Sequence, residues 1–361
     1  MEKIQSVFGK YAERLQVLVD ASLQKFEPVW FKKYFDWSTP TSTLTYVSAI
    51  GRNRIEAAAS VVDRKSPAPT RSRQGLEKLS GTVPAIKESF RMNEEDYRNF
   101  QSVQQMNVSD QTKRDMLMKL LFDDVKKAGD APLKRVDIMC LQALSLGKVQ
   151  INVTNNPDGI ITNDIDLLMP SDNFKKVAVI WSTPTTSTPI TDIKTIVIAA
   201  NAKGIKFEKM LMTLETFWKL QLSAETVKQL SGFFRVAQGQ AIASTLEQIN
   251  QYLNANFFPI IEIVNEQIGI EKDGLITTFN PWNANSVSFI PSGKLGLIHN
   301  AFAIEQMEPV AGLNYATYEN VLIKKYRQHN PWGEFTDCEL NAFPGVEAID
   351  RIYILDVETA A

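Results

Sequence analysis

Two pairs of closely spaced carboxylates are the residues of this chain best suited to acid-base chemistry. Asp123 and Asp124 are adjacent, and Asp164 and Asp166 are two positions apart. Paired carboxylates can act as general acid and general base when their environments separate their pKa values. Asp123 and Asp124, however, fall on the polar side of a predicted helix, and the other pair falls in a predicted strand return. We therefore interpret both pairs as solvated surface residues.

The other reactive side chains form no recognisable motif. The two histidines, His299 and His329, belong to no HExxH or His/Cys pattern that would hold zinc. Neither a GxSxG motif nor a glycine-rich phosphate loop occurs. The two cysteines, Cys140 and Cys338, allow no disulfide framework, and Cys140 falls on an apolar helix face, where a buried thiol is expected. We expect no catalytic residue, no cofactor and no metal.

Composition excludes several classes of protein. The 361 residues are 44% hydrophobic, which is enough for one large or two modest cores, and the net charge is -2 with a pI near 5.9. That balance indicates neither an anionic membrane nor a nucleic acid as a partner through the global charge. No run approaches the roughly 20 apolar residues of a membrane span, and the N-terminus has no signal-peptide core.

The segment Val62–Gln105 is too long for an ordinary loop and too poor in apolar residues to fold alone. Two extended legs of about 20 residues would each reach roughly 65 Å at about 3.3 Å per residue. A globular chain of this length has a radius of gyration of about 21 Å, so an ordered arm of that reach must overhang its own body. Burial of its scattered apolar residues would contribute less free energy than the ordering of its backbone costs in conformational entropy. We expect it to lie on a second copy of the chain, with a solvated disordered linker as the alternative.

Charge in this segment favours a contact between copies. The outgoing leg carries clustered cations, which include Arg64, Lys65, Arg71 and Arg73. The returning leg carries clustered carboxylates, those of Glu94, Glu95 and Asp96. A basic tip and an acidic root suit a head-to-tail contact between identical subunits. We expect these seven residues to lie at inter-subunit contacts, with the tip meeting an acidic patch of a neighbour.

Helical periodicity dominates the regions around this segment. Residues 4–26 predict an amphipathic helix, and the strip that follows them is interpreted as an N-terminal arm rather than a core domain. A helix capped near Asp110 is expected to stop at Gly129, and a second helix to open at Pro132 and end at Gly147. Together they would form a strut of about 35 residues, or roughly 50 Å.

The rest of the chain alternates strands with helices. A hairpin is expected from residues 149–153 and 160–168, and later strands at 206–212, 259–264, 286–290, 321–326 and 351–357. Helices are expected after Thr188, from Thr213, from Ser223 and over 241–253. The predicted fold class is α+β with mixed topology.

Four stretches, in this order and at these spacings, carry a resemblance to a known family. They are Gly81–Phe90, Arg135–Val149, Pro189–Ile193 and Phe289–Gly296. With the arm, long loop, strut, hairpin and α/β lobe, they resemble the lambda-type major capsid proteins of tailed bacteriophages, known as major capsid protein E. The resemblance extends over most of the chain from about residue 55 onward.

The resemblance implies the tailed-phage major capsid fold, divided into five parts. These are an N-terminal arm (1–55), an extended loop (56–106), a spine helix with the peripheral domain (107–170), an axial domain (171–309) and returning strands (310–361). It also implies a non-enzymatic shell protein that forms hexamers and pentamers in an icosahedral virion, assembled in the host bacterial cytoplasm. The implied partners are scaffold, portal and decoration proteins and packaged double-stranded DNA without sequence specificity, but no membrane.

Three other interpretations remain open at this stage. A nanocompartment shell would share the architecture and hold protein cargo instead of DNA. A carboxylate-based hydrolase would need Asp or Glu residues converging in one cleft. A phage tail tube or sheath protein would assemble into rods.

Overall fold

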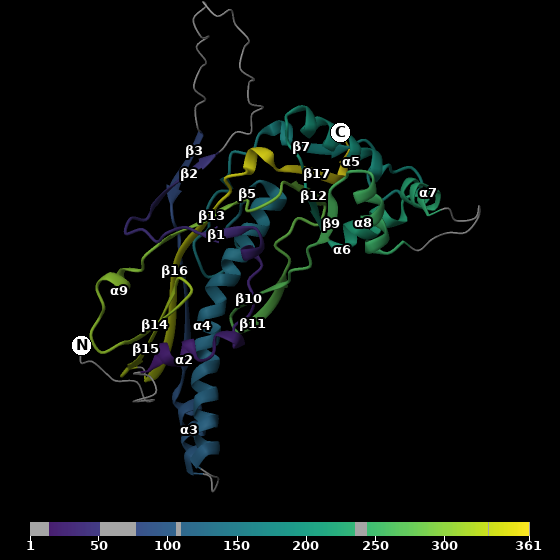
Figure 1. Cartoon of the computed structure of the whole chain (residues 1–361). Helices are drawn as coiled ribbons and strands as arrows, with labels where there is room; N and C mark the ends of the chain where they lie inside the picture. The colour runs from purple at the N-terminus through teal and green to yellow at the C-terminus, as the bar shows by residue number, and fades with distance from the viewer. Residues whose placement is uncertain (1–13, 51–76, 106–109, 235–243, 331, 361) are drawn as a thin grey trace, which may run out of the picture. The chain divides into compact units, whose positions relative to one another are not determined.

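The computed structural model describes residues 14–50, 77–105, 110–234, 244–330 and 332–360 (Figure 1). The chain divides into two compact units. Unit 1 comprises Met1–Tyr46, Gly81–Asp137 and Ile298–Pro344, and unit 2 comprises Val47–Ser80, Ile138–Leu297 and Gly345–Ala361. Both units combine helices with a sheet, so the predicted α+β class is confirmed. The units begin and end at other residues than the five predicted parts, whose names as peripheral and axial domains stay predictions.

A six-stranded sheet organises unit 1. Its order is β1 (Phe35–Trp37), β13 (Gly296–Ala301), β16 (Gly333–Gly345), β15 (Val321–Gln328) and β14 (Asn314–Tyr318), with β4 (Ala85–Met92) also paired to β16. Over Glu334–Glu339, β16 pairs antiparallel with β15 on one side and with β4 on the other. This part of β16 is therefore the centre of the sheet. The sequence analysis predicted β15 but missed β16, the longest strand that the structure describes.

Helices and short turns accompany this sheet. They are α2 (Leu15–Asp20), η1 (Leu23–Lys25), η2 (Phe31–Lys33), α3 (Glu94–Gln105), α4 (Asp110–Leu146) and α9 (Ile304–Met307). Among the described residues, no helix is both long enough and apolar enough to cross a membrane.

Helix α4 is one continuous helix of 37 residues, so the predicted stop at Gly129 and restart at Pro132 are wrong. Gly129 is instead a point of close approach. A Cβ there would lie 2.6 Å from Cε1 of Phe26, whose ring stacks on Tyr318 at 3.8 Å between centroids. Pro132 breaks one backbone hydrogen bond of the helix, but it is buried together with Leu133, and this packing holds the helix together.

The segment before β1 belongs to the core, contrary to the prediction of an arm separate from it. Phe31 and Phe35 are fully buried. Asp137 of α4 fixes this segment, because its carboxylate accepts hydrogen bonds from the backbone N–H of Phe31 at 2.7 Å and of Trp30 at 3.2 Å. Residues 4–13 of the helix predicted over 4–26 lie outside the described residues.

The expectation that the segment Val62–Gln105 is not ordered by contacts within its own chain is wrong for residues 77–105. Strand β3 (Glu77–Thr82) forms a two-stranded sheet with β2 (Thr45–Ile50), β4 joins the large sheet, and α3 follows. Residues 51–76 lie outside the described residues. The energetic argument failed for β4 because it counted apolar side chains and ignored the backbone hydrogen bonds that a long-range partner strand supplies.

A five-stranded sheet organises unit 2. Its order is β7 (Phe174–Val177), β17 (Tyr353–Ala360), β12 (Ser286–Ile290), β8 (Lys209–Met212) and β9 (Ile260–Ile263). The helices are α5 (Pro189–Ala202), α6 (Leu214–Leu222), α7 (Ala224–Phe233) and α8 (Leu246–Ala255), with turns η3 (Ser171–Asn173) and η4 (Ile349–Arg351). Their apolar faces meet the sheet in one core, which includes Trp181, Phe289 and Tyr353.

Capping explains where the helices of unit 2 begin. Thr213 and Ser223 accept hydrogen bonds from backbone N–H groups of α6 and α7, as predicted from their residue types. Helix α5 has no side-chain cap from Thr188; instead Glu225 of α7 accepts a hydrogen bond from the Ile190 N–H at 2.8 Å. A carboxylate at this end also suits the positive end of the helix dipole.

Two short hairpins complete unit 2. Strands β10 (Ile268–Lys272) and β11 (Leu275–Phe279) form an antiparallel hairpin around Asp273 and Gly274. The predicted hairpin after α4 is present, but its strands are only β5 (Lys148–Val149) and β6 (Ile165–Asp166). Between them the chain is a polar turn, where Asn155 donates to the Gln150 carbonyl, so alternation alone overestimated the strands.

Candidate functional site

The seven predicted contact residues fall into two groups. The cations Arg64, Lys65, Arg71 and Arg73 lie outside the described residues. Glu94, Glu95 and Asp96 lie in the first turn of α3 in unit 1, and all three residues are exposed. The structure therefore presents an acidic helix terminus to solvent, where the helix dipole stabilises negative charge.

Local hydrogen bonds shape this acidic turn. The Asn93 N–H donates to Asp96 at 3.2 Å, and the Asp96 N–H donates to the Asn93 side chain at 2.9 Å. This reciprocal pair starts the helix in the manner of a capping box. Arg98 pairs with Glu94 at 2.6 Å one turn later, but both side chains are well exposed, so the pair contributes little stability.

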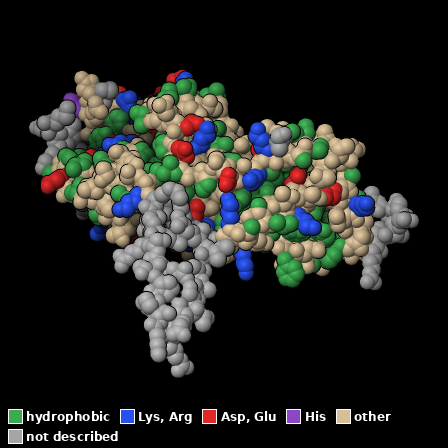
Figure 2. All heavy atoms as spheres, turned by 90° about the horizontal axis from the view of Figure 1, so that it is seen from above, with side chains coloured by type: hydrophobic (Ala, Val, Ile, Leu, Met, Phe, Trp, Pro, Cys, Tyr) green, Lys and Arg blue, Asp and Glu red, His purple; other side chains and the backbone are tan. Residues whose placement is uncertain are grey.

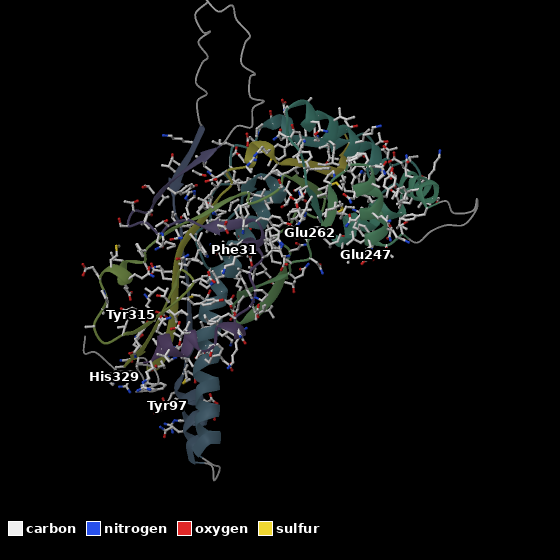
Figure 3. The ribbon with its side chains drawn as sticks, in the orientation of Figure 1. Phe31, Tyr97, Glu247, Glu262, Tyr315 and His329 are labelled. Atoms are coloured by element: carbon white, nitrogen blue, oxygen red, sulfur yellow. The ribbon has the colours of Figure 1, made fainter. Side chains whose placement is uncertain are left out.

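Aromatic contact positions α3. The ring of Tyr97 (Figure 3) lies against Trp332, with 5.0 Å between centroids. The Trp332 carbonyl also accepts a hydrogen bond from Arg91 of β4 at 2.8 Å. Trp332 thus ties the acidic helix to the strand that precedes it.

A chain of opposite charges crosses the sheet of unit 1. Lys87 on β4 pairs with Glu339 on β16 at 3.1 Å, and the two are partners in the strand register. Lys324 on β15 lies 3.9 Å from Glu339 and 2.6 Å from Glu305. Tyr315 (Figure 3) donates a hydrogen bond to the second oxygen of Glu305 at 2.9 Å. Sequence reasoning missed this network, because its charged members lie on β4, β15, β16 and α9 and only the folded chain brings them together.

The environment of Glu305 favours its charged form. Burial by itself would raise the pKa of this carboxyl, but the hydrogen bonds from Lys324 and Tyr315 outweigh burial and lower the pKa below its usual value. The side chains of Lys324 and Glu305 are only 13% and 18% exposed. The pair is thus largely shielded from water, so the loss of either partner would leave the other charge uncompensated.

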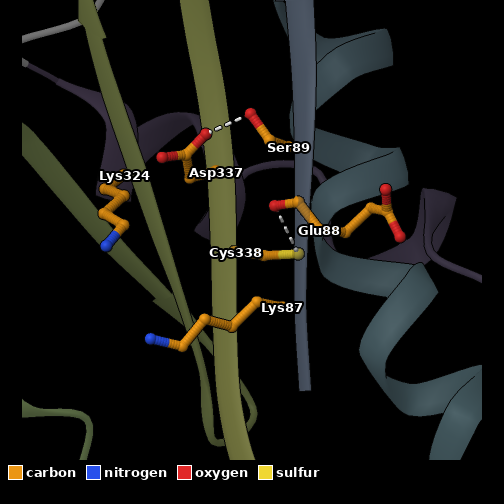
Figure 4. A pocket seen from close by; sticks show the side chains of 6 residues that line it. All are labelled: Lys87, Glu88, Ser89, Lys324, Asp337 and Cys338. Carbon is orange, nitrogen blue, oxygen red and sulfur yellow. Dashed lines mark hydrogen bonds between the residues drawn. The ribbon is translucent and has the colours of Figure 1, made fainter. Parts of the chain in front are cut away.

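A hollow of about 370 Å³ lies on the β4–β16–β15 part of the sheet (Figure 4). Its lining residues are Lys87, Glu88, Ser89, Lys324, Asp337 and Cys338. Ser89 donates to Asp337 at 2.6 Å, and burial raises the pKa of Cys338 to about 12. A thiol that stays protonated is a poor nucleophile, and no histidine lines the hollow. We find no catalytic arrangement here.

A buried lysine lies in the same sheet. Lys325 is fully buried and donates a hydrogen bond to Thr336 at 2.6 Å. Burial lowers its pKa, and the charges of Glu334 and Asp124 act in the opposite direction. Asp124 of α4 is itself largely shielded, and burial raises its pKa. The interpretation of Asp124 as a solvated residue is therefore wrong, whereas Asp123 is exposed.

The remaining candidates for chemistry are structural or exposed. Asp164 and Asp166 are exposed, and Asp164 pairs with Lys148 at 2.5 Å. His329 is an exposed residue of the turn after β15, and His299 belongs to an aromatic stack within unit 1. Cys140 is fully buried, as predicted. Within the described parts of the chain, no group of His, Cys, Asp or Glu could hold a metal ion.

The surface charge is mixed. Figure 2 shows basic and acidic side chains interspersed on one face of the molecule. This distribution agrees with the net charge of -2 and gives that face no field of one sign. The described surface offers exposed charges for contacts with other molecules and no reactive centre.

Comparisons with known proteins point to one family. The sequence profile described as phage major capsid protein E matches residues 21–357. A search of curated proteins found no match. Among solved structures, the chain is similar to a prophage capsid protein from E. coli CFT073, with a TM-score of 0.59 and 15% identity over 96% of this chain and 98% of that chain.

Two further solved structures are similar at lower scores. One is a phage-related protein from Bordetella bronchiseptica RB50, with a TM-score of 0.49 and 9% identity over 99% of this chain and 98% of that chain. The other is the capsid asymmetric unit of cyanophage A-1(L), with a TM-score of 0.46 and 11% identity over 92% and 94%.

Proposed function

The chain belongs to the family of phage major capsid protein E and is a shell protein of the virion, and from this premise we propose that its copies form hexamers and pentamers that close into an icosahedron around double-stranded DNA. The fold is that of the tailed-phage major capsid proteins, as the resemblance of four short stretches implied. The match of the family profile to residues 21–357 is the observation that carries the proposal. The matched range includes most of both units.

The extended loop supplies the contact between neighbours in this proposal. Arg64, Lys65, Arg71 and Arg73 at its tip meet an acidic patch on the next subunit. The exposed first turn of α3, with Glu94, Glu95 and Asp96, supports this assignment because it presents such a patch on a fixed element. Each exposed pair contributes roughly 0–1 kcal/mol, and repetition over a closed shell adds these terms together.

The proposed function requires no catalysis. Both thiols are buried, and the carboxylates of Glu305 and Glu339 in unit 1 are paired with lysines. The chain acts by self-association, and its other proposed partners are a scaffold protein, a portal and decoration proteins. DNA contacts are weak and without sequence preference, as the near-neutral charge suggests. Assembly takes place in the cytoplasm of the host bacterium.

Electron microscopy of the purified full-length chain tests this proposal. Closed, roughly spherical shells are expected, and nuclease-protected double-stranded DNA is expected in particles from infected cells. Rods would indicate a tail tube or sheath protein instead. Shells that hold protein cargo and no DNA would indicate a nanocompartment, and small oligomers alone would contradict the proposal.

A further inference from the structure

Three aromatic rings from three strands of unit 1 form one stack. Tyr46 of β2 stacks on His299 of β13, with 5.1 Å between centroids and 22° between planes. Tyr46 also stacks on Phe343 of β16, with 5.2 Å and 26°. Tyr46 is 7% exposed, so this member of the stack is buried.

Strand β3 closes on the same tyrosine. A Cβ at Gly81 would lie 3.0 Å from the Tyr46 hydroxyl oxygen and from its Cε1 atom, so a larger residue there would displace this ring by a few tenths of an ångström. Strands β2 and β3 form one two-stranded sheet, and Val83 after β3 donates a backbone hydrogen bond to the Leu44 carbonyl at 2.7 Å. The stack therefore holds both strands of this small sheet at the same point.

His299 is the titratable member of the stack. Its Nε2 atom is buried and has no hydrogen-bond partner among the described residues. Burial lowers the pKa of the imidazole below its ordinary value of 6.5. A proton on Nε2 would place an N–H donor and a positive charge where the described residues offer neither an acceptor nor a counter-charge.

The charged groups on the neighbouring strands do not compensate that charge. Burial raises the pKa of Tyr46 to about 12, so its hydroxyl stays neutral. On the packed strands, Asp36 of β1 and Lys78 of β3 are exposed, and Glu339 of β16 pairs with lysines. Burial alone therefore lowers the pKa of His299, with no charge partner acting on it.

We propose that the stack of Tyr46, His299 and Phe343 is an acid-sensitive clasp, in which protonation of His299 releases Tyr46 and loosens strands β2 and β3. In the closed stack the pKa lies below 6.5, and in the open form the ring regains its ordinary value. The open form therefore binds more protons as the pH falls below about 6.5, and acid favours opening. Above that pH the stack stays closed. This inference goes beyond the proposed function and holds for a single subunit.

Two measurements on the unassembled full-length chain test the clasp. The first is an NMR titration of the two histidine rings, where His299 is expected to titrate below 6.5. The second is hydrogen exchange of β2 and β3, expressed as protection factors at about pH 7.5 and about pH 5 so that the chemical pH dependence of exchange is removed. Protection of these strands is expected to fall several-fold in acid.

Two variants separate the clasp from general acid sensitivity. His299→Phe keeps an aromatic ring in the stack and removes the titration, so the acid-induced loss of protection is expected to disappear. His329→Gln removes the other, exposed histidine and is expected to keep the loss. Titration of His299 at or above 6.5, or an acid response in His299→Phe equal to that of the unmodified chain, would overturn the proposal. The NMR titration of the unmodified chain tests the proposal even if His299→Phe fails to fold.

Discussion

The side chain of Gln16 binds both backbone groups of Thr317. Its oxygen accepts a hydrogen bond from the Thr317 N–H at 2.7 Å, and its amide donates to the Thr317 carbonyl at 3.1 Å. Thr317 lies on β14, at the end of the strand order of the unit 1 sheet. Gln16 thus occupies backbone groups through which another strand could add to this edge.

Gln16→Ala is expected to lower the free energy of unfolding by about 1 kcal/mol, because a replaced hydrogen bond of this kind contributes about that much. Urea unfolding measures the change. Gln24→Ala, at an exposed position of η1, is the matched control and is expected to change stability little. An equal loss of unfolding free energy in both variants would show that the contact with Thr317 does not contribute to stability.

Two glycines in helices predict opposite responses to alanine. Gly129→Ala places a Cβ 2.6 Å from Phe26, and this overpacking is expected to cost about 1–3 kcal/mol, which exceeds the gain in helix propensity. Gly232→Ala in α7 meets nothing within 4 Å and is expected to stabilise by up to about 1 kcal/mol. Thermal or urea unfolding of both variants checks the pair. Stabilisation of both would contradict the close packing of α4 on Phe26.

Lys324→Met is expected to cost about 2–4 kcal/mol, because it leaves the shielded carboxylates of Glu305 and Glu339 without this cation. Lys87→Met is the matched control. It also removes a partner of Glu339, but the Lys87 side chain is 59% exposed, so a cost of about 0–1 kcal/mol is expected. Equal costs would show that shielding does not distinguish the two pairs.

The pH dependence gives a second readout of the same pair. The pKa of Glu305 is lowered in the fold, so its contribution is present above its ordinary pKa of 4.5 and is lost as the pH falls through the folded value. The loss of stability in acid is expected to be smaller in Lys324→Met than in the unmodified chain. Urea unfolding at several pH values below about 5 measures it.

Reversal of Arg71 and Arg73 to Glu is expected to give a folded, soluble subunit that forms no shells, because like charges then meet at the proposed contact. The control reverses two exposed lysines outside the loop, Lys206 and Lys272, and changes the net charge by the same amount. Electron microscopy scores shells, and circular dichroism scores folding. Normal shells from the loop variant would show that the charges of Arg71 and Arg73 are not needed for assembly.

Signals from neighbouring residues predicted many of the elements of unit 2. Much of unit 1 could not be predicted, because its strands pair with partners that are far away in the sequence. Thr213 and Ser223 correctly predicted the starts of α6 and α7, because a helix cap involves only residues that are close in the sequence. The pairing of β4 with β16 joins residues about 250 positions apart, as between Lys87 and Glu339, and nothing local marks it. The charge network on that sheet was unpredictable for the same reason.

The error at Gly129 was of the opposite kind, because a local signal was present there and was misleading. Gly129 has the residue type of a helix stop, yet it serves the approach of Phe26 within a continuous helix. Sequence alone cannot tell these uses apart, because the partner ring lies about 100 positions away. Of the predicted contact residues, Glu94, Glu95 and Asp96 are exposed on a helix that was not predicted, and their role at a contact between subunits stays a prediction.

The most direct test of the account is a cryo-electron microscopy reconstruction of the assembled shell in which residues 51–76 can be traced. The account predicts that these residues lie on a neighbouring subunit, with Arg71 and Arg73 within ion-pair distance of its carboxylates. A trace in which they pack only on the subunit that carries them would contradict it.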